Sequence, residues 1–237
     1  MNQLPKSIYD AHGGLNLWEQ ITQIQTEISG GGLALAIKLR QPCYSNLKVA
    51  FFKKSNHVEI ILNKKKNKIG IYKNGKSSII KNGQEVEQKL NVGDNPKKTR
   101  AFWRDCDQMY FRGYAFLNYF STPFFFLDKE FLISEIGNWK EGKENWKMFK
   151  VIFPDKIITH SKEQTFYFDE NNLLRRLDYT VELYGKWAKV AQYCFGHSNF
   201  DGYVFPTKRR MYKLFKNNKP FRFPMIWLNY KYINIIC

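Results

Sequence analysis

The strongest secondary-structure signal lies in residues 166–212, which read FYFDENNLLRRLDYTVELYGKWAKVAQYCFGHSNFDGYVFPTKRRMY. Apolar and polar side chains alternate along three segments here, which predicts three strands: residues 173–183, 187–197 and 203–215. Turn-forming residues separate the segments at Tyr184-Gly185 and Asp201-Gly202. The stretch therefore predicts an antiparallel meander.

Short strands are also predicted on both sides of this meander: residues 21–29, 33–39, 47–52, 57–62, 68–72, 77–80, 131–139, 146–153, 164–168 and 225–233. Gly30-Gly31-Gly32 makes residues 21–29 and 33–39 a predicted hairpin. Asn74-Gly75 and Asn82-Gly83 are further turn signals.

Helical spacing of apolar residues predicts a helix within residues 1–20, where Gly13-Gly14 mark a kink or a close backbone contact. A buried helix is predicted over residues 99–119, followed by an apolar loop or short lid at 124–127. The pattern indicates one α+β domain over residues 1–237, a large curved antiparallel sheet with helices against one face. Its segments are residues 1–20, 21–98, 99–128 and 129–237.

The charge is strongly positive, with 38 Lys and Arg against 21 Asp and Glu and a net charge of +17. It is concentrated in residues 43–100 and 205–237, and the second block holds no acidic residue. Lys greatly outnumbers Arg, whereas a nucleic-acid site would favour the planar guanidinium. A solvated basic surface is the first interpretation, an anionic head group or membrane surface the second, and nucleic acid the last.

The N-terminal residues show no basic segment followed by an apolar one, so a cytoplasmic protein is expected. Four isolated cysteines are expected to be free thiols: Cys43, Cys106, Cys194 and Cys237. No metal site and no cofactor are predicted, because the sequence lacks metal-ligand spacing, a Walker loop and a dinucleotide fingerprint.

The meander resembles the bacterial lipoprotein-carrier and lipoprotein-sorting (LolA-like) superfamily. The resemblance rests on Asn172-Leu173 before one strand, on Gly202 to Thr207 (Gly-Tyr-Val-Phe-Pro-Thr) opening another, and on His12-Gly13-Gly14 with Trp18 near the N-terminus. It implies a half-open antiparallel barrel whose helices cover the concave face and whose cup holds acyl chains or other apolar ligands. Without an export signal, a cytoplasmic branch of that superfamily is expected.

Strand parity predicts an aromatic interior with a few polar groups. Tyr179 and Leu177 share one side of their strand, Tyr193 and His197 one side of the next, and Phe205, Thr207 and Arg209 one side of the third. Apolar walls with sparse polar groups are typical of ligand sites, although the same residues could simply fill the core. The predicted ligand-binding residues are Trp103, Phe116, Tyr179, Phe205 and Arg209.

The leading hypothesis is that the cup binds a small hydrophobic molecule such as a lipid, an isoprenoid or a polyketide-like compound. The alternative is a biosynthetic cyclase, isomerase or dehydratase acting on such a molecule in the same cup. Its predicted catalytic residues are His197, Tyr193 and Asp201, because a histidine near a carboxylate can act as a general base. A surface role for His197 is the competing interpretation.

Overall fold

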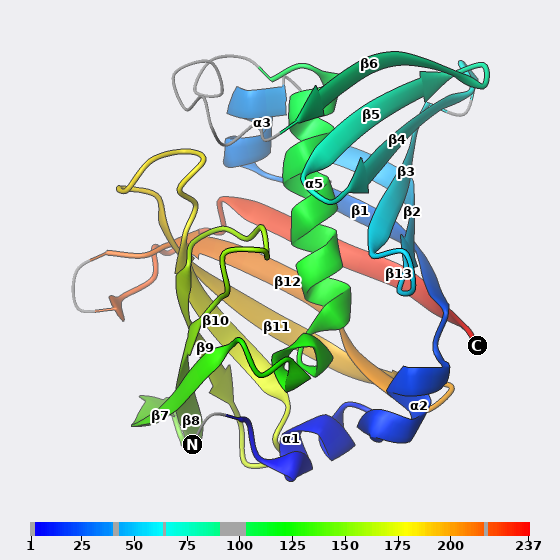
Figure 1. The fold of residues 1–237 in the computed structure, drawn as a ribbon. Coiled ribbons are helices and arrows are strands. Elements are labelled where there is room, and N and C mark those ends of the chain that lie inside the picture. Colours follow the sequence, from blue (N-terminus) through cyan, green and yellow to red (C-terminus); the bar gives the residue numbers. More distant parts are fainter. Residues whose placement is uncertain (1–2, 40–42, 64, 91–102, 216–217) are drawn as a thin grey trace. The chain divides into compact units, whose positions relative to one another are not determined.

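The computed structural model describes residues 3–39, 43–63, 65–90, 103–215 and 218–237. Contacts within the chain divide it into two compact units (Figure 1). Unit 1 consists of Met1–Gln20 and Ser121–Pro224, and unit 2 of Ile21–Phe120 and Met225–Cys237. The single domain over residues 1–237 stays a prediction.

The described strands of unit 1 form an antiparallel sheet in the order β12-β11-β10-β9-β8-β7, so each strand pairs with its neighbour along the chain. The strands of this sheet are β7 (Leu132–Glu141), β8 (Glu144–Ile152), β9 (Glu163–Phe168), β10 (Leu174–Thr180), β11 (Lys189–Phe200) and β12 (Tyr203–Lys213). The three strands of the predicted meander are β10, β11 and β12. Asp201 and Gly202 both have positive φ, which closes the two-residue turn between β11 and β12.

Three short helices cover one face of this sheet, which we call the helix-covered face: α1 (Lys6–Ala11), α2 (Gly14–Gln20) and the 3₁₀ helix η2 (Phe124–Leu127). Trp18 stacks on Phe124, with ring centroids 4.7 Å apart, and lies 6.3 Å from the ring of Tyr203. Phe126 meets Phe166 edge to face at 4.9 Å. Because Phe124 and Phe126 are buried, the predicted lid is part of the core of unit 1.

The predicted N-terminal helix is broken between α1 and α2 at the two glycines. Gly13 has a φ of +114°, and a Cβ there would lie 2.6 Å from the carbonyl oxygen of Gly202. Both the predicted kink and the predicted close backbone contact therefore occur. Glycine is required because an L side chain rarely adopts this φ and would collide with the β11–β12 turn.

The described strands of unit 2 form a second antiparallel run in the order β6-β5-β4-β3-β2-β1-β13. Their bounds are β1 (Gln23–Gly31), β2 (Cys43–Phe52), β3 (His57–Asn63), β4 (Lys68–Lys73), β5 (Lys76–Lys81), β6 (Gln84–Leu90) and β13 (Ile226–Ile236). The sequence does not predict β6. Val86 and Leu90 on this strand are both exposed, so the strand has no buried apolar face that alternation in the sequence would reveal.

Residues 33–39 form a helix, α3 (Leu33–Leu39), and their prediction as a strand is wrong. Gly32 has a φ of +126° and lies against the backbone of Met225, and the amide of Leu35 donates to the carbonyl of Gly32 at 3.1 Å. The Leu and Ala residues of this segment favour a helix, and its alternation is too short to distinguish the two structures.

The helix α5 (Asp105–Ser121) runs across the sheet of unit 2 (Figure 1). Gly113 allows close contact, since a Cβ there would lie 2.1 Å from the Cβ of Tyr72. Phe120 lies 6.0 Å from Phe51 of β2. The predicted central helix is thus confirmed from Asp105, while residues 99–102 lie outside the described part of the chain. No helix of the described residues is long and apolar enough to cross a membrane.

The predicted α+β class with a large antiparallel sheet is confirmed, since every strand pairing given above is antiparallel and helices pack against the strands.

Candidate functional site

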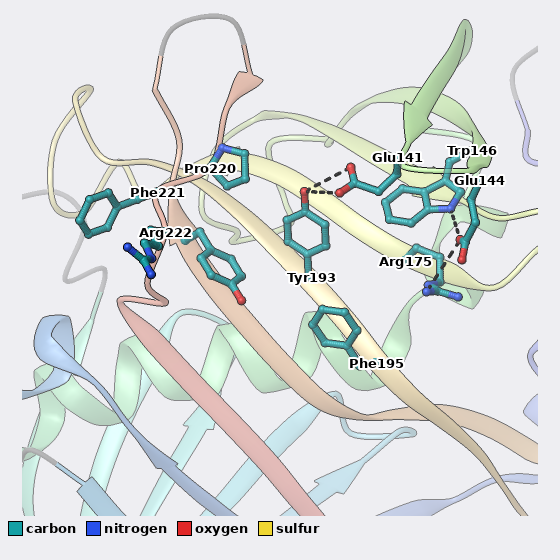
Figure 2. Close-up of a pocket in the computed structure, with 10 residues that line it drawn as sticks. Glu141, Glu144, Trp146, Arg175, Tyr193, Phe195, Pro220, Phe221 and Arg222 are labelled. Carbon is teal, nitrogen blue, oxygen red and sulfur yellow. Dashed lines mark hydrogen bonds and ion pairs between the residues drawn. The ribbon is translucent and has the colours of Figure 1, made fainter.

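A pocket of about 450 Å³ lies in unit 1 (Figure 2). It is on the sheet face opposite the helix-covered face. We call this the pocket face. The faces are assigned by strand alternation: Phe166 and Phe168 contact the helices and η2, so Tyr167 between them points the other way. The pocket is lined by Glu141, Glu144, Trp146, Arg175, Tyr193, Phe195, Tyr212, Pro220, Phe221 and Arg222.

The floor of the pocket rests on a buried cluster of Trp146, Tyr167, Ala191, Tyr193 and Leu214, with three flanking residues: Trp139, Met148 and Tyr212. Strand register places these side chains together. Trp139 lies opposite Trp146, Tyr193 opposite both Arg176 and Arg210, and Ala191 opposite Tyr212. Aromatic side chains from five strands therefore form one continuous apolar surface on the pocket face.

Arg176 lies at the centre of this surface and is 0% exposed. Its guanidinium donates to both carboxylate oxygens of Asp178, at 2.7 and 2.8 Å, and to the hydroxyl of Tyr193 at 3.1 Å. The guanidinium carbon lies 4.9–5.2 Å from the ring centroids of Trp139, Tyr167 and Tyr193. Burial opposes the charge on Arg176, but Asp178 outweighs it, so the pKa of Arg176 is raised.

The β7–β8 hairpin supplies two carboxylates at the edge of the pocket. The indole Nε1 of Trp139 donates to Glu141 at 2.6 Å, and that of Trp146 donates to Glu144 at 2.7 Å. These bonds fix the orientation of both indole rings. The hydroxyl of Tyr193 lies 3.3 Å from Glu141, and burial raises the pKa of Tyr193 to about 12. Tyr193 is therefore a neutral hydrogen-bond donor at neutral pH.

The other side of the pocket is formed by residues after β12. The amide of Phe221 donates to the carbonyl of Lys213 at 2.8 Å, and Leu214 forms a backbone bridge with Pro220. This folds the chain back so that Phe221 and Arg222 reach the pocket. Arg175 lies on the opposite side, where it pairs with Asp169 at 3.1 Å and lies 3.8 Å from Glu144.

Of the three predicted catalytic residues, Tyr193 lines the pocket. His197 is on the same strand, and its Nε2 lies 3.0 Å from the carbonyl oxygen of Leu174. Burial lowers the pKa of His197 to about 4. Asp201 occupies the exposed turn between β11 and β12. Among the residues that the structure describes, the hydrogen bond of His197 Nε2 is made to Leu174 and not to Asp201.

Tyr179, Phe205 and Arg209 lie on the helix-covered face. Arg209 donates to Cys194 Sγ at 3.3 Å and its guanidinium lies 5.2 Å from the ring centroid of Phe205, while Tyr179 donates to Gln192 at 2.8 Å. The predicted grouping of Tyr193 with Phe205 and Arg209 is wrong. The two-residue turn pairs Phe200 with Tyr203, so Tyr193 lies opposite Arg210 and Arg209 lies opposite Cys194.

Trp103 and Phe116 belong to unit 2. Trp103 precedes α5 and lies 5.1 Å from Phe111, and Phe116 lies 6.3 Å from Phe120 on α5. Both are buried. The ligand-binding and catalytic roles assigned from the sequence stay predictions.

Several pocket residues are missed by the sequence reasoning: Glu141, Glu144, Trp146, Arg175, Phe221 and Arg222. One signal could have indicated the first three. Trp139 and Trp146 flank the Gly142-Lys143 turn symmetrically, so a hairpin there pairs the two indoles next to two carboxylates. Phe221 and Arg222 carry no such signal, because they reach the pocket through an irregular segment.

Comparisons with known proteins identify the fold. No family model matches the chain, and no curated protein matches it. Among solved structures, a LolA superfamily protein from Nitrosomonas europaea is similar at a TM-score of 0.54 and 13% identity, covering 98% of this chain and 93% of that one. A DUF1329 family protein from Desulfovibrio piger has a TM-score of 0.46 at 10% identity, covering 97% and 92% of the two chains. The first of these shows that the chain has the LolA-like fold that the meander predicted.

Proposed function

We propose that this chain, which has the LolA-like fold, binds a small amphipathic molecule with an apolar body, such as a lipid, an isoprenoid or a polyketide-like compound. The observation that carries the proposal is the composition of the pocket. Trp146, Tyr193, Phe195, Tyr212 and Phe221 surround one space of about 450 Å³. Small-molecule sites have this range of volume and combine aromatic walls with a few polar groups.

The charged residues of the pocket determine the orientation of the bound ligand in this proposal. Arg222 is exposed at the side formed by the segment after β12, while Glu141 and Glu144 lie at the β7–β8 side. Glu141 and Glu144 each accept an indole hydrogen bond, so they are already partly satisfied. An apolar body would lie against Trp146 and the ring faces beside it, with its polar end toward Arg222. Burial of apolar surface would supply most of the binding energy.

Native mass spectrometry of the purified chain tests this proposal. We expect a co-purified small apolar molecule whose mass is lost after organic extraction, and whose occupancy falls in Phe195→Ala. Leu132→Ala is the matched control, because Leu132 is an exposed apolar residue of the same sheet that does not line the pocket. A chain that purifies without a ligand and also ignores fatty-acid and polyene probes would contradict the proposal.

An enzymatic use of the site, as a cyclase, isomerase or dehydratase, is the alternative proposal. Tyr193 is the predicted residue that favours it, because its hydroxyl lies in the pocket between Arg176 and Glu141. With its pKa raised to about 12, Tyr193 would act as a proton donor and not as a base. Turnover that is lost in Tyr193→Phe while ligand binding persists would support this alternative.

We propose the cytoplasm as the compartment, because all four cysteines are free and two of them, Cys106 and Cys194, are buried. Free thiols are typical of a reducing environment. Fractionation of the native host with an antibody against the chain tests this placement.

A further inference from the structure

We propose that an exposed aromatic and basic patch of unit 1 docks on the surface of an anionic lipid bilayer. The patch consists of Trp187, Lys213, Phe215, Phe221, Arg222 and Phe223. The inference goes beyond ligand binding, because it concerns the outer surface of the unit and does not require an occupied pocket.

The aromatic members of the patch are unusually exposed for their size. Trp187 is 68% exposed and Phe223 is 60% exposed, and Phe215 and Phe221 are also exposed. Single exposed apolar residues are ordinary, but contiguous ones mark an interaction surface. Tryptophan and phenylalanine are typical of surfaces that enter the interface of a bilayer.

Ring–ring and cation–π contacts join these residues into one surface. The ring centroids of Phe215 and Phe221 are 5.9 Å apart, and those of Phe221 and Phe223 are 6.2 Å apart. Lys213 Nζ lies 5.7 Å from the ring centroid of Trp187 and 5.4 Å from that of Phe215. The patch is therefore continuous from Trp187 to Phe223.

The charge of the patch selects an anionic partner. Lys213 lies between two of the rings, and the guanidinium carbon of Arg222 lies 5.3 Å from the ring centroid of Phe223. Residues 205–237 contain no Asp or Glu. Cations interleaved with aromatic residues match a leaflet that presents negative head groups above an apolar layer. Each such cation contributes about fivefold to partitioning onto an anionic leaflet.

The ring geometry favours a bilayer over single-stranded nucleic acid, which prefers the same residue types. Phe215 and Phe221 are inclined at 80°, and Phe221 and Phe223 at 75°. Bases stack on ring faces presented in succession, whereas edge-to-face rings form a compact apolar wedge.

The patch also borders the pocket, because Phe221 and Arg222 belong to both. A chain docked through the patch would hold this side of the pocket at the head-group layer. An amphipathic ligand could then pass between the bilayer and the pocket without crossing water. This last step rests on the proposed function, whereas docking does not.

Vesicle sedimentation of the full chain tests the docking. We expect binding to vesicles of phosphatidylcholine mixed with phosphatidylserine, weaker binding to phosphatidylcholine alone, and a loss of binding as salt is raised. Trp187→Ala with Phe223→Ala should reduce binding to the mixed vesicles at least about tenfold, and Lys213→Gln with Arg222→Gln should remove most of the preference for the anionic lipid. Leu132→Ala with Ile136→Ala is the apolar control, and Lys147→Gln is a charge control away from the patch.

Two further readouts separate the outcomes. Blue-shifted tryptophan fluorescence on adding anionic vesicles should disappear in Trp187→Phe, which preserves an aromatic residue at that position. Phe195→Ala should lower ligand occupancy without changing vesicle binding, so failure of the pocket and failure of the patch are distinguishable. Equal binding to neutral and anionic vesicles, no binding at low salt, or loss of binding only in the control variants would overturn the proposal. So would binding of single-stranded DNA, and not of vesicles, that depends on the same residues.

Discussion

Arg176 and Tyr193 meet at the base of the pocket, where Nη1 of the arginine donates to the tyrosine hydroxyl at 3.1 Å and the guanidinium carbon lies 5.2 Å from the ring centroid. The two residues face one another across β10 and β11. A buried charge therefore supports an aromatic pocket wall. Its neutralising partner is Asp178, two residues along the same strand.

The first prediction concerns this charge. Arg176→Met should destabilise the chain by about 3–5 kcal/mol, because it leaves the carboxylate of Asp178 buried without its cation. Adding Asp178→Leu should recover most of that loss, since an apolar pair of similar size leaves no buried charge. Urea unfolding of the two variants measures both effects. A double variant as unstable as the single one would show that the ion pair is not the reason for the loss.

The second prediction separates backbone strain from collision at Gly13. Gly13→Ala and Gly137→Ala both place an alanine at a φ near +110°, but nothing lies within 4 Å of a Cβ at Gly137, whereas Gly202 O lies 2.6 Å from a Cβ at Gly13. Each variant should lose about 1–3 kcal/mol from strain. Gly13→Ala should lose more, and equal losses in thermal unfolding would contradict the contact between the α1–α2 break and the β11–β12 turn.

The third prediction is a sign reversal in unit 2. Glycine to alanine within a helix normally stabilises by about 1 kcal/mol. Gly113→Ala should instead destabilise, because its Cβ would lie 2.1 Å from the Cβ of Tyr72 on β4. Tyr72→Gly in the same chain removes that Cβ and should restore the stabilising sign, relative to Tyr72→Gly alone. A stabilising single variant in urea unfolding would mean that α5 does not pack this closely on the sheet.

The fourth prediction concerns pH. Burial lowers the pKa of His12 from 6.5 to about 4, and that of His160 from 6.5 to about 3. Below pH 6.5 these histidines bind protons in the unfolded chain but stay neutral in the folded chain. Their contribution to the free energy of unfolding is therefore fully present above pH 6.5 and falls as the pH drops toward about 4. The slope is at most about 1.4 kcal/mol per pH unit for each histidine. His12→Gln should flatten the fall measured by unfolding at several pH values, and an unchanged slope would exclude His12 from it.

Much of the local alternation and several turns could be predicted from the sequence. Asp201-Gly202 and Asn74-Gly75 mark turns because their positive φ values suit these residue types. The faces of neighbouring strands were harder to predict. Parity within each strand is visible in the sequence, but which face of β11 matches which face of β12 depends on the pairing of Phe200 with Tyr203.

The pocket could not be predicted for the same reason. Tyr193 and Arg176 share a face only through register, and Phe221 reaches the site through an irregular segment after Leu214. Residues 33–39 form a helix because Gly32 turns the chain against Met225, a contact distant in sequence. Short-range patterns thus predicted most of the elements, while long-range pairing determined the site.

The aromatic pocket of unit 1 is proposed to bind an apolar molecule. Titration of the chain with a fluorescent fatty acid in vesicle-free buffer tests it most directly. Saturable binding is expected, weakened about tenfold (about 1.4 kcal/mol) in Phe195→Ala with Phe221→Ala and unchanged in Leu132→Ala. Identical affinities in the three proteins, or no saturable binding in any of them, would contradict the account.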